Sequence, residues 1–88
     1  MKSYTEKQLA EILPLWTYKN NTLQRDFEFI DFKAAFAFML QVAFHAEILD
    51  HHPKWTNVYN KVSITLSTHT ENQITAKDIE LANRIDRI

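Results

Sequence analysis

Histidines and carboxylates gather in one short region of this chain. His51 and His52 are adjacent, Glu47 precedes His51 by four residues, and Asp78 follows His69 by nine. Histidine is the only side chain whose unperturbed charge change lies near neutral pH. Three of the chain's four histidines lie here, so the region suggests proton transfer or metal binding.

Two such bases on opposite sides of a small molecule can remove one proton and donate another, and each role contributes ~10²–10⁴-fold in rate. A carboxylate, from Glu47 or Asp78, could fix a histidine tautomer and favour its protonated form. No serine or cysteine beside the histidines gives a nucleophile signature. The residues therefore favour elimination or hydration over acyl transfer. A histidine metal site stays equally open, although it lacks a helical pair at i, i+4 and any cysteine.

Each residue also has a structural interpretation. Asp78 has capping-box spacing with Thr75, a role that does not exclude a place in a site. Glu47 could be a solvated carboxylate at a helix end, although the negative helix terminus disfavours it there. Packing or interface roles are expected for three further side chains: His45, Trp55 and Tyr59.

The composition predicts one globular domain over residues 1–88, with 45% hydrophobic and 24% charged residues. A net charge of −1 argues against a nucleic-acid surface. No stretch approaches the ~20 apolar residues of a membrane span, and the first seven residues lack an apolar signal core, so we expect a cytoplasmic protein. With no glycine, phosphate loops are excluded and asparagines should occupy the turns. The candidates are Asn20, Asn21, Asn57, Asn60 and Asn72.

The first half of the chain predicts a helix, a hairpin and a long helix. Two pairs have capping-box spacing, Ser3 with Glu6 and Thr5 with Gln8, and Pro14 ends the first helix. Strands are expected over 15–19 and 22–29, joined by an Asn20-Asn21 turn, with Phe27 and Phe29 on one face. Asp31 caps a helix from Phe32 to about Leu49.

The long helix is apolar nearly all round. Its apolar positions are Phe32, Phe36, Met39 and Ala43 in one stripe, Ala35, Phe38, Val42 and Leu49 in a second, and Leu40, Phe44 and Ile48 beside them. Such a helix is buried on more than one side. One sheet covers only one side, so we expect a partner chain on the other and hence a homo-oligomer. The alternative is a helix sandwiched within the monomer, for which few elements remain.

The second half predicts strands over 58–60 and 61–68, with Val62, Ile64 and Leu66 facing the helices. If the second strand runs far enough, Ser67 and His69 lie on its open face. A last helix begins at the Thr75–Asp78 capping box and turns Ile79, Ala82 and Ile85 inward. The order α-β-β-α-β-β-α predicts an α+β fold, a four-stranded antiparallel sheet with helices packed on one face.

The central stretch reads Glu47, three residues, His51-His52-Pro53, five residues, Tyr59, nine residues, His69, eight residues, Asp78. It resembles the signature of the pterin-4a-carbinolamine dehydratase family. The runs 51–62 and 64–69 are similar to that family's most recognisable text, and the resemblance covers nearly the whole chain.

The resemblance implies loss of water from 4a-hydroxytetrahydropterin to give quinonoid dihydropterin, in the recycling of tetrahydrobiopterin. It implies no metal and no organic cofactor, because the pterin is the substrate. It assigns catalysis to His51, His52 and His69. We prefer His51 and His69 as the proton-transfer pair with His52 holding the substrate, and leave open which is acid and which is base. The implied substrate-binding residues are Glu47, Pro53, Ser67, Thr68 and Asp78, of which Glu47 and Asp78 would orient or tune histidines.

The resemblance also implies a dimer or tetramer, formed through the long helix and sheet edges, with no nucleic-acid or membrane partner. An alternative function is a protein-interaction module, since animal members of the family also stabilise dimers of a homeodomain transcription factor. The three histidines favour the enzyme, because an interaction module would not need them.

Overall fold

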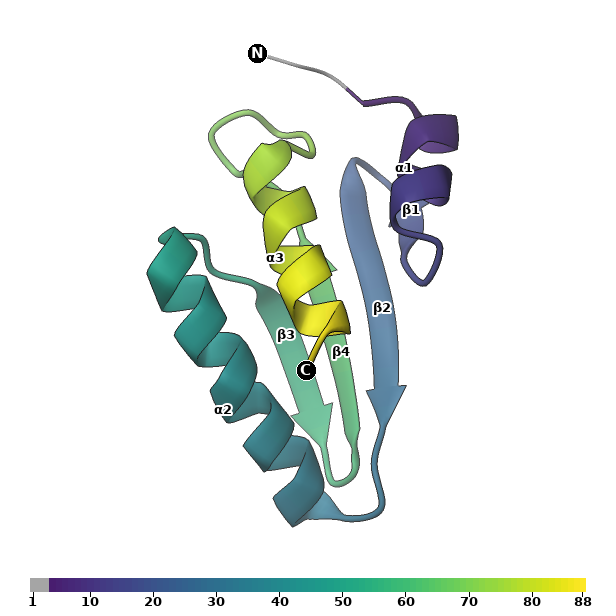
Figure 1. Ribbon diagram of the computed structural model, residues 1–88. Coiled ribbons are helices and arrows are strands. Elements are labelled where there is room, and N and C mark those ends of the chain that lie inside the picture. The colour runs from purple at the N-terminus through teal and green to yellow at the C-terminus, as the bar shows by residue number, and fades with distance from the viewer. Residues whose placement is uncertain (1–3) are drawn as a thin grey trace.

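The computed structural model describes residues 4–88, in which a four-stranded antiparallel sheet carries helices on one face (Figure 1). The strands lie in the order β1-β2-β4-β3. Their bounds are β1 (Thr17–Lys19), β2 (Thr22–Glu28), β3 (Lys54–Val58) and β4 (Lys61–Leu66). The helices are α1 (Glu6–Ile12), α2 (Phe32–Leu49) and α3 (Ala76–Asp86). The predicted α+β class and the order α-β-β-α-β-β-α are confirmed.

The helices begin where side chains can cap them. At α1, the Gln8 backbone N–H donates to Thr5 Oγ1 at 3.1 Å, and the Thr5 N–H donates to Gln8 Oε1 at 2.9 Å. Asp31 Oδ1 accepts from the Ala34 N–H at 2.8 Å, which sets the start of α2 as predicted. The other capping pair that we predicted for the first helix includes Ser3, which lies outside the described residues.

The glycine-free chain makes its turns with other residues at positive φ. Asn20 and Asn21 have φ of 51° and 60° and join β1 to β2, as expected for a two-residue hairpin turn. Asn72, which we also expected in a turn, has a φ of 51°. Asp50 and Tyr59 take the left-handed region without having been singled out for it.

The prediction for the third strand was wrong. We expected a strand over 58–60, whereas β3 spans Lys54–Val58 and the turn to β4 is Tyr59-Asn60. Because Val58 pairs with Lys61, the two residues between them form the turn and cannot belong to either strand. β3 is an edge strand, and Trp55 is its one residue packed on the core. Its other side chains need no alternating apolar pattern, so little in the sequence indicates a strand over these residues. β4 also ends earlier than expected, at Leu66.

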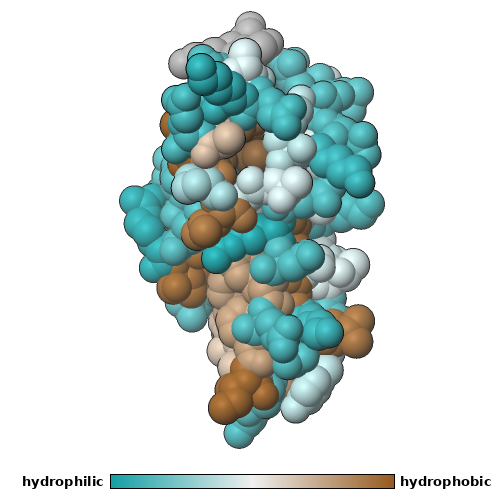
Figure 2. Space-filling model, turned by 90° about the vertical axis from the view of Figure 1, so that its right-hand side faces the viewer, coloured by the Kyte–Doolittle hydropathy of each residue, from teal (hydrophilic) through white to brown (hydrophobic). Residues whose placement is uncertain are grey.

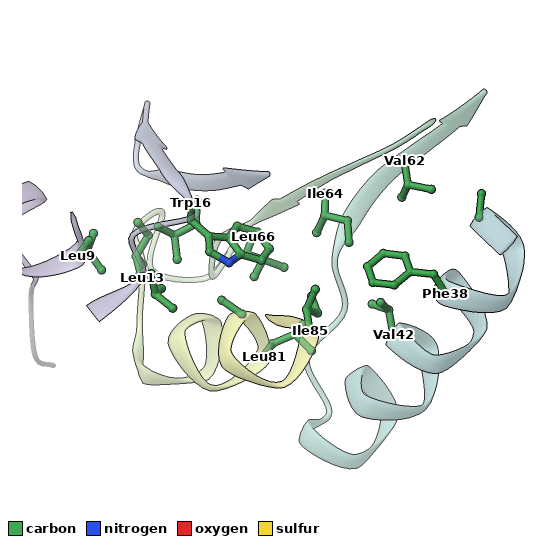
Figure 3. Close-up of a cluster of buried hydrophobic side chains, with 14 residues drawn as sticks. Leu9, Leu13, Trp16, Phe38, Val42, Val62, Ile64, Leu66, Leu81 and Ile85 are labelled. Carbon is green, nitrogen blue, oxygen red and sulfur yellow. The ribbon is translucent and has the colours of Figure 1, made fainter. Parts of the chain in front are cut away.

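The core lies between the sheet and the helices α2 and α3, which share one side of it (Figure 3). Val62, Ile64 and Leu66 alternate along β4 and are at most 1% exposed, as predicted. From α3, Leu81, Ala82 and Ile85 fill the facing layer. The cluster continues to Leu9 of α1 and to Leu13 and Trp16, which follow that helix.

Only one stripe of α2 is buried in the chain itself. The covered positions are Ala35, Phe38, Val42 and Ala46, and the exposed apolar ones are Phe32, Phe36, Leu40, Phe44 and Ile48. The alternative of a helix sandwiched within the monomer is therefore contradicted for the described residues. On the side away from α2, hydrophobic residues form separate patches among hydrophilic ones (Figure 2).

Our expectation that no stretch resembles a membrane span needs correction for α2. The helix has 18 residues with a mean hydropathy of 1.4, which is enough to cross a membrane by length and composition alone. That is weak support for a span, because the core helix of a soluble protein passes the same test. Here the buried stripe of α2 packs on β4 and α3.

Candidate active site

A pocket of about 460 Å³ lies where α2 ends, β3 begins and β4 ends. It is lined by Asp50, His51, His52, Pro53, Lys54, Ser67, Thr68, His69, Thr70 and Lys77. The three clustered histidines of the sequence thus line one hollow, although two of them follow a helix and the third follows a strand.

The end of α2 directs the first histidine pair. Asp50 takes a left-handed conformation with φ of 49°, which stops the helix. The N–H groups of Asp50 and His51 then donate back to Glu47 O at 3.2 Å and Ala46 O at 3.0 Å. Pro53 favours an extended backbone at the residue before it, so the chain is extended at His52 after the helix has ended.

His51 pairs with Asp78 across the fold. The His51 Nε2 atom lies within hydrogen-bond reach of Asp78 Oδ1, and the side chains are 11% and 0% exposed. A carboxylate only accepts hydrogen bonds, so this contact places the His51 proton on Nε2 and leaves Nδ1 as the second ring nitrogen. Among the described residues, no hydrogen bond is made to that Nδ1.

Asp78 is held from a second side by the start of α3. Its Oδ2 accepts from the Thr75 backbone N–H and from the Thr68 hydroxyl, each at 2.8 Å. The predicted Thr75–Asp78 capping interaction therefore exists, and the same carboxylate also holds His51. The capping prediction is confirmed, and a capping role leaves Asp78 able to contact His51, because its two oxygens face different partners.

The second histidine–carboxylate pair is exposed. His52 Nε2 lies 2.5 Å from Glu47 Oε2, and the two side chains are 59% and 75% exposed. The adjacent histidines thus have separate carboxylates, one buried and one in solvent. Adjacent residues of an extended segment point in opposite directions, which separates the two pairs.

The remaining predicted residues lie along the other wall. His69 is exposed, and no hydrogen bond is made to its ring within residues 4–88. Ser67 and Pro53 are partly buried in the pocket lining. β4 ends before Ser67, so Ser67 and His69 follow the strand instead of lying on its open face.

The pocket contains most, but not all, of the residues that the sequence nominated. Glu47 and Asp78 are absent from its lining and reach it through His52 and His51. Four lining residues were not predicted from the sequence: Asp50, Lys54, Thr70 and Lys77. Each is a direct neighbour of a motif residue, and that adjacency was the only signal available. No group of three or more metal-ligating side chains converges among residues 4–88.

Comparison with known proteins shows which family this chain matches. The model of the family described as pterin 4 alpha carbinolamine dehydratase matches residues 2–88. A Burkholderia lata protein is 49% identical over 89 residues, covering 99% of this chain and 87% of that protein. A Rhodospirillum rubrum protein is 51% identical over 85 residues, covering 94% and 88%. Both are provisionally named pterin-4-alpha-carbinolamine dehydratases.

A solved structure is similar over the whole fold. The crystal structure of a protein from Brucella melitensis, described as a transcriptional coactivator/pterin dehydratase, superposes with a TM-score of 0.89 at 42% identity. The match covers 98% of this chain and 97% of that one.

Proposed function

Because the chain belongs to the pterin 4 alpha carbinolamine dehydratase family, we propose that it removes water from a 4a-hydroxytetrahydropterin by histidine acid–base catalysis. The observation that carries this proposal is the single pocket lined by His51, His52 and His69. The product is the quinonoid dihydropterin, so the enzyme serves tetrahydrobiopterin recycling.

The reaction needs two proton transfers. An acid protonates the 4a-hydroxyl, the C4a–O bond breaks and water leaves. A base removes the proton from N5, and the electron pair of that N–H bond forms the C4a–N5 double bond. Each transfer contributes ~10²–10⁴-fold when the group is held within hydrogen-bond reach.

His51 is suited to be the base. Its Nε2–H is held by buried Asp78, which leaves Nδ1 to accept the N5 proton. The imidazolium formed by that transfer is stabilised by the neighbouring carboxylate, as in other aspartate–histidine pairs. The Asp78 contact therefore keeps a carboxylate beside the ring that would receive the proton.

His69 is suited to be the acid and His52 to hold the substrate. The ring of His69 is exposed, so it can regain its proton from water after each turnover. His52 is paired with exposed Glu47, and both side chains have room to move when a pterin enters. This assignment keeps His51 and His69 as the proton-transfer pair.

The chemistry needs no metal or organic cofactor, because both steps are proton transfers to or from the pterin. We further propose that the protein is a cytoplasmic homo-oligomer, a dimer or tetramer formed through the exposed face of α2 and a sheet edge. The apolar side chains on that face support the oligomer.

Stopped-flow absorbance of 4a-hydroxytetrahydropterin decay tests the proposed reaction. We expect the protein to accelerate the decay and the variants H51A and H69A to lose most of that acceleration. The fourth histidine, His45, lies on α2 outside the pocket, 3.5 Å from Arg84, so H45A is the matched control. No acceleration by the folded protein would refute the proposal.

A second candidate function is a dimerisation module without catalysis. Two observations favour it: the uncovered apolar face of α2, and the description of the Brucella melitensis structure as a transcriptional coactivator. Under this alternative, H51A and H69A would leave the biological activity of the protein intact, whereas charged substitutions on α2 would remove it.

A further inference from the structure

Thr68 lies between the pocket and the buried carboxylate of Asp78. Its Oγ1 is 2.8 Å from Asp78 Oδ2 and 2.7 Å from Thr75 Oγ1. Its backbone N–H donates to Gln73 O at 3.0 Å, in a bridge that pairs these two residues. Thr68, the second residue after β4, is thereby fixed through both its main chain and its side chain.

The direction of each proton follows from the acceptors. A carboxylate has no proton to give, so the Thr68 hydroxyl donates to Asp78. A hydroxyl has one proton, so Thr75 must donate to Thr68 Oγ1. The hydrogen bonds therefore run in one direction, from Thr75 to Thr68 to Asp78. At the other carboxylate oxygen, His51 is the donor.

We propose that Thr68 is a positioning residue for the dehydration: its hydroxyl orients the Asp78 carboxylate and so fixes His51 with the proton on Nε2 and Nδ1 free for the substrate. This inference rests on the proposed function. It differs from the pterin contact that the family resemblance implies for Thr68, because the hydroxyl proton is already committed to Asp78.

The contribution of Thr68 is distinct from that of Thr75. The Thr75 backbone N–H holds Asp78 Oδ2 whatever side chain residue 75 carries. The Thr68 hydroxyl is the side-chain donor to that oxygen, and it comes from the strand side of the pocket instead of from α3. Two donors from different elements thus hold Oδ2, and loss of the Thr68 hydroxyl would leave that oxygen with the Thr75 N–H as its one donor among the described residues.

Steady-state kinetics of two matched variants test the proposal. T68V keeps the shape and removes the hydroxyl, and we expect kcat to fall about 10- to 100-fold with KM unchanged, the range known for groups that orient metal-ligating histidines. T68S keeps the hydroxyl and should restore kcat. T56V makes the same change at an exposed position on β3 outside the pocket and should leave both constants unchanged.

A raised KM with unchanged kcat in T68V would overturn the proposal, because it would identify Thr68 as a pterin contact. Unchanged values of both constants would also overturn it. Nitrogen-15 NMR of the histidine rings gives a readout that does not need turnover. We expect wild-type His51 to be protonated on Nε2 when neutral, and T68V to lose that single tautomer.

The NMR experiment distinguishes failure of the positioning role of Thr68 from failure of the proposed function. If the wild-type protein does not accelerate dehydration, the proposed function fails, yet the tautomer of His51 in the wild type and in T68V still tests the positioning role. If T68V does not fold, T68A, which also lacks the hydroxyl, takes its place in both measurements. A neutral His51 with its proton on Nδ1 would contradict the proposal.

Discussion

His51 and Asp78, which lie 27 positions apart in the chain, pair through Nε2 and Oδ1, and the carboxylate of the pair has no exposed surface. Burial makes this contact different from the neighbouring His52–Glu47 pair, which lies in solvent. Hydrogen bonds to a buried charge are strong, and leaving such a charge without its partners is costly. We therefore expect both the proposed catalysis and the stability of the fold to depend on Asp78.

Replacing Asp78 by asparagine should damage both properties. D78N keeps the size of the side chain but presents an amide, which cannot accept from all three donors now facing Asp78. We expect kcat to fall about 10²–10⁴-fold, as for other aspartate–histidine pairs. The free energy of unfolding should fall by about 1–3 kcal/mol, measured by urea denaturation.

Asp86 provides the matched control on the same helix. Its Oδ1 accepts from Trp16 Nε1 at 2.9 Å and from Arg25 Nη1 at 2.5 Å, far along α3 from the pocket. D86N should lower stability and leave kcat unchanged. Equal loss of kcat in D78N and D86N would show that Asp78 acts only through folding.

The exposed Glu47–His52 pair should affect substrate binding and leave the stability of the fold unchanged. The side chains of Glu47 and His52 are 75% and 59% exposed, and ion pairs in solvent contribute about 0–1 kcal/mol. E47Q should therefore leave the melting temperature unchanged. If His52 holds the substrate, E47Q should raise KM more than it lowers kcat, which steady-state kinetics would detect. A large fall in melting temperature would contradict this account.

The uncovered face of α2 predicts the oligomeric state. Leu40 and Phe44 are 49% and 62% exposed and lie outside the core cluster, so F44K spares that core but places a charge in the expected interface. Sedimentation velocity should show an oligomer for the wild type and smaller species for F44K, with unchanged circular dichroism. I12K, on the exposed side of α1, is the control and should not dissociate the oligomer. A folded wild-type monomer at micromolar concentration would refute the interface.

Tyr59 belongs to the sequence motif, yet the structure places it in the β3–β4 turn, at the far end of β3 from the pocket residue Lys54. Five residues of strand span ~17 Å, so its side chain is remote from the histidines. Its φ of 52° is costly for tyrosine and tolerated by asparagine. Y59N should raise the free energy of unfolding by about 1 kcal/mol in urea denaturation and leave turnover unchanged. Loss of turnover would give Tyr59 a role that this geometry does not explain.

Local signals in the sequence determined most of the secondary structure. Asp31 as a cap and the apolar residues after it predicted the bounds of α2, and Asn20-Asn21 predicted the first hairpin. These predictions were right because caps and two-residue turns depend on neighbouring residues. β3 was misplaced because an edge strand owes its structure to the ladder it forms with β4, which no local pattern records.

The sequence by itself determined which residues could do the chemistry, since three histidines and two carboxylates in one motif are visible without a fold. Only the tertiary structure decided how they combine. It assigned Asp78 to His51 and Glu47 to His52, and it committed the Thr68 hydroxyl to Asp78. The physical reason is that burial and hydrogen-bond partners arise when α2, β4 and α3 pack together, and spacing along the chain carries no information about which side chains then meet.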